Sequence, residues 1–135
     1  MIMDKQNIFS EDQAVTVSAI STNLIDLGSE SSLVQGINEI GSAPLVIQCT
    51  TTFAGGTSLK VDICNKAAAT ITDATESIIA SAVIATASLK EGYQFRIGLP
   101  KQIEHRYLGI YYTVVGTMSA GAITAGFVMD QQTSN

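Results

Sequence analysis

The side chains that could carry out chemistry are few in this chain and widely spaced. His105 is the single histidine, so neither the histidine cluster of a cupin-type metal site nor a paired-histidine zinc site can be built. A Ser-His-Asp or Cys-His catalytic site would have to use His105, whose neighbours Glu104 and Arg106 are typical of a solvated strand entrance. We therefore expect no catalytic residue, no metal and no cofactor, and we expect that the chain is not an enzyme.

The glycine-containing segments also lack the residues that recognised catalytic and phosphate-binding motifs require. The segment 117–121 lacks the first glycine of a nucleophile elbow, and Gly55-Gly56-Thr57 lacks the lysine of a phosphate-binding loop. Carboxylates are scattered along the sequence, and two of them could still converge in the folded chain as an acid pair. We expect them to be solvated surface or turn residues.

The composition indicates one globular domain that is poor in charge. The chain has 135 residues, of which 46% are hydrophobic and 14% are charged, against about 25% charged in an average soluble domain. Charge is depleted at the centres of protein interfaces, so this profile suits a surface that contacts other proteins. The net charge of −5 gives no basis for binding nucleic acid. No signal peptide or membrane-spanning run is apparent, and we expect a soluble protein made in a reducing compartment.

Alternation of apolar residues near the C-terminus predicts two antiparallel strands. The runs 106–115 and 122–130 flank a turn that contains Gly116 and Gly121, and we expect them to form a hairpin. Since side chains alternate across a strand, one face of the first run carries Leu108, Ile110, Tyr112 and Val114, and the opposite face carries Tyr107, Gly109, Tyr111 and Thr113. In the second run Ile123, Ala125, Phe127 and Met129 share the inward face.

A second hairpin is predicted over residues 44–63. Apolar residues occupy its odd positions, and a three-residue loop at 54–56 keeps odd positions opposite one another, with Phe53 opposite Thr57 and Cys49 opposite Val61. In this register Cys49 points inward and Cys64 points outward. We therefore expect two free thiols and no disulfide.

The remaining segments complete an all-β fold. Strands are predicted at 13–19, 23–27 and 93–99, with a long connection at 29–43. In the strand at 93–99 alternation places Tyr93, Phe95, Ile97 and Leu99 inward. Residues 76–87 fit either one amphipathic helix or two short strands, and their β-branched residues favour strands. The total is about eight antiparallel strands in a jelly-roll or β-sandwich. We expect a single domain over residues 13–135, preceded by an extended N-terminal arm over residues 1–12.

Blocks of residues along most of the chain resemble the small capsid cement, or decoration, proteins of tailed bacteriophages with podovirus-like heads. They are Asp4-Lys5-Gln6-Asn7-x-Phe9-Ser10-x-x-Gln13-Ala14-Val15-Thr16, Ile25-Asp26-Leu27-Gly28, Leu89-x-x-Gly92-Tyr93-x-Phe95, Leu99-Pro100, Arg106-Tyr107-Leu108, Tyr112-Thr113-x-x-Gly116-Thr117 and Gly121-x-Ile123-Thr124-Ala125-Gly126-x-Val128-x-Asp130. The segments 29–43 and 65–87 match this pattern least. No contact made by those two segments is therefore carried over.

The resemblance implies a jelly-roll fold and a structural, non-enzymatic role in the virion. Such a protein would be made in the bacterial host cytoplasm and would bind the outer surface of the capsid. Its partners would be the major capsid protein and further copies of itself, as a homodimer or a homotrimer, with no nucleic acid and no membrane involved. The alternative from another class is a carbohydrate-binding jelly-roll module, such as a lectin-like adhesin.

Two groups of residues are candidates for the capsid or oligomer interface. The first is the N-terminal arm, whose apolar anchors and polar side chains are Ile2, Asp4, Lys5, Gln6, Asn7, Ile8 and Phe9. The second is the outward side of the 106–115 strand with Arg106, Tyr107 and Tyr111, because arginine and tyrosine are enriched among interface hot spots. The alternatives are that the arm packs along its own domain, and that Tyr107 lies at the edge of the core beneath Arg106.

Overall fold

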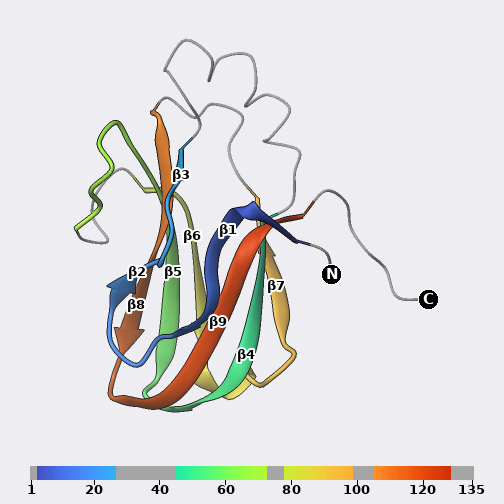
Figure 1. Ribbon diagram of the computed structural model, residues 1–135. Helices are drawn as coiled ribbons and strands as arrows, with labels where there is room; N and C mark the ends of the chain where they lie inside the picture. The colour runs from blue at the N-terminus through green and yellow to red at the C-terminus, as the bar shows by residue number, and fades with distance from the viewer. Residues whose placement is uncertain (1–2, 27–44, 73–77, 99–104, 129–135) are drawn as a thin grey trace.

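The computed structural model describes residues 3–26, 45–72, 78–98 and 105–128, which form two facing antiparallel sheets (Figure 1). The first, here the β9 sheet, has the order β1 (Met3–Ala14), β9 (Met118–Val128), β4 (Leu45–Gly55) and β7 (Gln94–Ile97). The second, the β8 sheet, has the order β2 (Ala19–Ile20), β8 (Tyr107–Val115), β5 (Ser58–Lys66) and β6 (Ile78–Ala85), with β3 (Ile25–Asp26) also paired to β8. A short 3₁₀ helix, η1 (Thr86–Ser88), follows β6. The predicted all-β sandwich is confirmed.

The order of the strands is that of a jelly roll. If β2 and β3 are counted as one interrupted strand, the first strand pairs with the last, β1 with β9, and the second pairs with the second-last, β2 and β3 with β8. In the same way β4 pairs with β7 and β5 with β6. This long antiparallel ribbon is then folded so that β9 lies beside β4 and β8 beside β5, which gives two facing sheets.

Both predicted hairpins are wrong in one respect, because their strands lie in different sheets. The chain passes from β4 to β5, and again from β8 to β9, by crossing between the sheets at the bottom of the view in Figure 1. The two crossings stack on each other: the Thr57 amide donates to the Val115 carbonyl at 2.8 Å. Gly55, Gly56 and Gly116 have φ of 75°, 62° and 88°, a region in which glycine avoids the steric cost of a side chain.

The core lies between the sheets and contains the side chains that alternation places inward. From the β8 sheet it receives Leu59, Val61, Ile63, Leu108, Ile110 and Tyr112, and from the β9 sheet Cys49, Phe53, Ile123, Ala125 and Phe127. All of these are buried. The inward faces predicted for the strands at 59–63, 108–112 and 123–127 are therefore correct, although the strands pair with different neighbours.

The N-terminal segment is a strand of the sandwich and not a separate arm. Residues 3–14 form β1, which pairs with β9 along the edge of the β9 sheet. Phe9 is fully buried, with its ring centroid 5.5 Å from that of Phe127. The predicted division into an arm at 1–12 and a domain at 13–135 is therefore corrected. Alternation failed here because β1 is irregular, with three register shifts against β9 and a positive φ at Asp12.

Several other strand boundaries differ from those predicted. The segment 13–19 is not one strand, because β1 ends at Ala14 and the chain turns before β2, which leaves Val17 70% exposed. Tyr93 precedes β7 and is exposed, where an inward position was predicted. Residues 78–85 form one strand, neither a helix nor two strands. The predicted connection at 29–43 and the inward positions of Leu99 and Met129 lie outside the described residues.

Neither cysteine forms a disulfide within the described residues, and both are buried. Cys49 lies in β4 and Cys64 in β5, on different sheets, and the prediction that they form no disulfide with each other is confirmed. Cys64 lies on the outward side of β5, beside Gly109 of β8. A Cβ atom at Gly109 would meet the side chains of Leu24, Ile71 and Ile20, so these three residues cover that part of the sheet.

Candidate interaction surface

The outer face of the β8 sheet is formed by rows of side chains from three neighbouring strands. Register and alternation place these side chains together, because residues opposite one another in paired strands share a face. From the stacked crossings toward Gly109, the successive rows across β8, β5 and β6 are Val115–Ser58–Ala85, Thr113–Lys60–Val83, Tyr111–Asp62–Ser81 and Gly109–Cys64–Ile78. This set of residues is called the outer face below.

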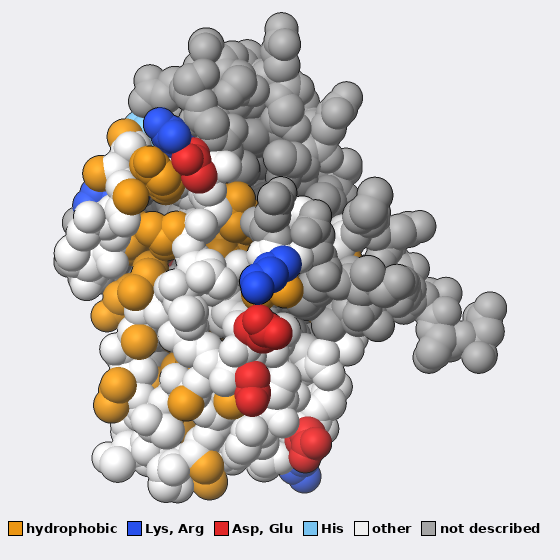
Figure 2. Space-filling model, in the orientation of Figure 1, with side chains coloured by type: hydrophobic (Ala, Val, Ile, Leu, Met, Phe, Trp, Pro, Cys, Tyr) orange, Lys and Arg blue, Asp and Glu red, His pale blue; other side chains and the backbone are white. Residues whose placement is uncertain are grey.

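The two ends of the outer face differ in exposure. Around Gly109 the face is covered by the chain itself, as the contacts of that glycine show. Near the crossings it is open, with Val83 65% and Val115 47% exposed. Hydrophobic side chains gather on the left side of Figure 2, where Figure 1 places β2 and β8. The open end is therefore a largely apolar surface, with Ser58, Thr113 and Lys60 between its valines.

A buried carboxylate lies in the middle of the outer face. Asp62 is fully buried, its Oδ1 accepts a hydrogen bond of 2.6 Å from Ser81, and the same oxygen lies 3.3 Å from the Lys60 ammonium. Among the described residues its Oδ2 has no hydrogen-bond partner, nor has the buried hydroxyl of Thr113 in the adjacent row. An unpaired buried polar atom costs stability. The charge of Asp62 is thus balanced within the chain, at some cost in free energy.

Arg106 precedes β8 and holds β3 against it. Its Nε and Nη2 donate to the two carboxylate oxygens of Asp26 at 2.6 and 2.7 Å, and its guanidinium carbon lies 5.2 Å from the centroid of the Tyr107 ring. The hydrogen bond and charge of Asp26 raise the pKa of Arg106 above its ordinary value. A fork of this geometry fixes orientation as well as charge. Arg106 thus lies over the ring of a half-buried Tyr107, the arrangement that the sequence offered as the alternative to an interface contact.

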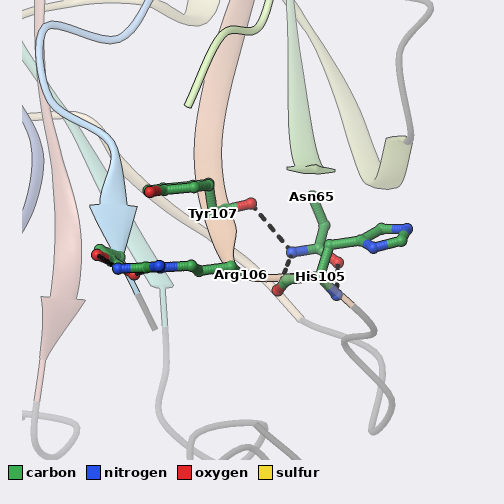
Figure 3. Close-up of polar contacts among 5 residues, drawn as sticks. Asn65, His105, Arg106 and Tyr107 are labelled. Carbon is green, nitrogen blue, oxygen red and sulfur yellow. Dashed lines mark hydrogen bonds and ion pairs between the residues drawn. The ribbon is translucent and has the colours of Figure 1, made fainter. Parts of the chain in front are cut away.

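Asn65 fixes the chain just before β8 (Figure 3). Its side-chain amide donates to the carbonyls of His105 and Tyr107 at 2.8 and 3.0 Å, and its Oδ1 accepts from the His105 amide at 2.8 Å. All three bonds use the backbone of the β8 entrance. Nδ1 of His105 is buried and has no hydrogen-bond partner in the described part of the chain. Within the described ranges, no three His, Cys, Asp or Glu side chains are grouped so that they could hold a metal ion.

The structure separates the two predicted groups of interface residues. Tyr107 and Tyr111 lie half-buried on the outward side of β8, as predicted, whereas the N-terminal candidates lie on β1 in the other sheet. Lys5 is exposed, Asn7 and Ile8 are half-buried, and Phe9 is removed from the candidates because it belongs to the core. Asp4 and Gln6 are part of β1, and Ile2 lies outside the described residues.

Sequence reasoning missed the most exposed residues of the outer face. Val83 was obscured because residues 76–87 fitted both a helix and strands, and Val115 because it stands next to the glycine turn. The burial of Asp62 had no signal at all in the sequence. Its even position places it outward, but only the neighbouring strands determine that Ser81 and Lys60 enclose it.

Comparison with known proteins matches most of the chain to a family model. The family model described as Bbp16 matches residues 9–127 of the chain, which covers nearly the whole sandwich. No curated protein matches the chain. Among the described residues, none of the helical structure is long and apolar enough to cross a membrane.

Proposed function

Because the chain belongs to the Bbp16 family, a family associated with phages, we propose that it is a structural virion protein. In this proposal it is a capsid cement protein that binds the outer surface of the phage head and stabilises contacts between major capsid protein subunits. The observation that carries the proposal is the open end of the outer face, where Val83 and Val115 are exposed on the β8 sheet.

The chemistry of this face suits contact with another protein. Interface centres are poor in charge and rich in side chains that pack without large entropy loss, and valine has a single side-chain dihedral. The two charged residues of the face, Lys60 and Asp62, already pair with each other. A partner therefore needs to supply no compensating charge when it covers the valines.

Cementing is an effect of mass action. A protein that binds the assembled shell and not its separate subunits stabilises the shell by the free energy of binding. Many copies act on one particle, and each copy bridges neighbouring subunits, so no single contact has to be strong. A catalytic centre is not needed for this role.

The direct test uses phage heads prepared without the protein. The purified chain should co-sediment with these heads and raise the temperature at which they break open. A chain that stays in the supernatant, and leaves that temperature unchanged, would refute the proposal.

One observation favours the carbohydrate-binding alternative. Tyr93 is 39% exposed, and its ring centroid lies 6.0 Å from that of Phe95 at the β7 edge of the other sheet. Exposed aromatic rings can stack on sugars. A glycan array separates the two functions: binding of a glycan that is lost in Tyr93→Ala, without any binding to heads, supports the alternative.

A further inference from the structure

Over the described residues the sandwich has four sheet edges, formed by β1, β7, the β2–β3 pair and β6. An edge strand presents unpaired backbone N–H and C=O groups to any extended chain that approaches it. Proteins commonly protect such edges with charged residues, bulges or very short strands. The four edges can be compared on these features.

Three of the edges are protected. Strand β1 has three register shifts and carries Lys5, Glu11 and Asp12. Strand β7 is only four residues long and includes Arg96. Strands β2 and β3 have two residues each, so they present no continuous row of backbone groups.

The β6 edge is the least protected of the four, with a single register shift against β5, between Ile63 and Cys64, near its Ile78 end. It is eight residues long, and its sequence, IIASAVIA, contains no charge, proline or glycine. Within the described residues it pairs with β5 on one side only, from Ser58–Ala85 to Cys64–Ile78. Ile78, Ser81, Val83 and Ala85 are exposed. A long, apolar and uncharged edge is the form of edge that recruits another strand.

We propose that β6 pairs antiparallel with β6 of a second copy, which joins two β8 sheets into one continuous sheet across a two-fold axis. This goes beyond the proposed function, because it assigns the surface of self-association, and it stands independently of capsid binding. The two outer faces would then form one wider surface.

The sequence of β6 suits a second copy of itself. Across a two-fold axis each residue meets a residue of the same strand at the same distance from the axis, and outward residues must meet outward residues. With the axis at Ala82, Ser81 lies opposite Val83, and Ala80 lies opposite Ile84. A charged residue at any position in β6 would lie close to the same residue of the second copy across the axis, and the two would repel each other. Strand β6 contains no charged residue.

The test is the mass of the full-length chain in solution, measured by light scattering and by sedimentation velocity. Wild-type protein should be a dimer. Val83→Glu should weaken the dimer at least tenfold, because pairing would bring two like charges close together across the axis, while in the monomer the new carboxylate stands beside Lys60. The matched control is Val17→Glu, at a similarly exposed valine between β1 and β2, which should remain a dimer.

A wild-type chain that is monomeric at its highest soluble concentration, or trimeric, would overturn the inference. So would a Val83→Glu protein that is as dimeric as the Val17→Glu control. Circular dichroism checks that the variants fold, and if Val83→Glu does not, Ala85→Glu at the exposed end of β6 replaces it with the same expectation. A monomer that still co-sediments with phage heads would refute the β6 pairing and leave the proposed function intact.

Discussion

At the scale of single residues, a series of side-chain hydrogen bonds connects the two sheets through the core. The Tyr112 hydroxyl in β8 lies 2.8 Å from Ser10 Oγ in β1. Ser10 donates onward to Gln13 Oε1 at 2.7 Å, so its oxygen accepts from the tyrosine. The same Gln13 oxygen accepts from the amide and the hydroxyl of Thr22, both at 2.9 Å. These bonds connect β8, β1 and the turn between β2 and β3.

The first prediction concerns the Tyr112 hydroxyl. Tyr112→Phe removes one donor and keeps the ring, while Ser10 retains its bond to Gln13. The expected loss in the free energy of unfolding is about 1 kcal/mol, the usual net value of one hydrogen bond. Urea denaturation measures it. A variant as stable as wild type would show that the Tyr112–Ser10 bond contributes nothing net.

The second prediction is the pH dependence that comes from the same phenol. Burial raises the pKa of Tyr112 above its ordinary value, whereas in the unfolded chain the group titrates near pH ~10. Above that pH the unfolded state loses a proton that the folded state keeps, so stability falls as pH rises, by up to about 1.4 kcal/mol per pH unit. The stability difference between wild type and Tyr112→Phe should be constant below pH ~9 and shift in favour of the variant above pH ~10. Parallel stability curves through this window would contradict the expectation.

At the scale of elements, alternation in the sequence determines which face of a strand is buried but not which strand lies beside it. The alternate residues predicted to point inward in the strands at 59–63, 108–112 and 123–127 do lie in the core. A hairpin and a crossing between sheets require the same inward pattern, so the pattern could not distinguish them. What distinguishes them here is the packing of Gly56 against Gly116, a contact between segments far apart in the sequence. The candidate site was predictable to the same extent: Tyr107 and Tyr111 point outward as expected.

The third prediction tests the stacked crossings. At Gly116, with φ of 88°, a Cβ atom would lie 2.9 Å from the Gly56 Cα, which is backbone and cannot rotate away. Gly116→Ala should destabilise the fold by at least ~2 kcal/mol from backbone strain and this contact. The control is Gly98→Ala, where a Cβ atom meets nothing within 4 Å, and its effect should stay within about 0.5 kcal/mol. Thermal unfolding compares the two, and equal effects would argue against the stacking.

At the scale of the whole molecule, the position of β1 changes what a truncation would test. As a free arm, residues 1–9 would be dispensable for folding. Residues 3–9, however, belong to a paired edge strand with Phe9 in the core, and so are part of the sandwich. The fourth prediction is that deletion of residues 1–9 lowers the free energy of unfolding by at least about 3–5 kcal/mol, the usual cost of losing a buried phenylalanine, which is a large part of the about 5–15 kcal/mol by which a domain is stable. A cooperative unfolding transition equal to that of the full chain would show that β1 is dispensable.

The fifth prediction tests which surface meets the capsid. Val115→Glu places a carboxylate at the open end of the outer face, and binding to the shell would have to bury that charge without a partner. Affinity for phage heads should fall at least tenfold, while Val17→Glu, outside the outer face, should bind as wild type does. Because the shell is stabilised through binding, each tenfold loss of affinity removes about 1.4 kcal/mol per occupied site when the protein is in excess. The temperature at which decorated heads break open should therefore fall for Val115→Glu and not for Val17→Glu. If both variants protect the heads as well as wild type does, the capsid contact lies elsewhere, and the β1 edge with Lys5 and Ile8 becomes the surface to test.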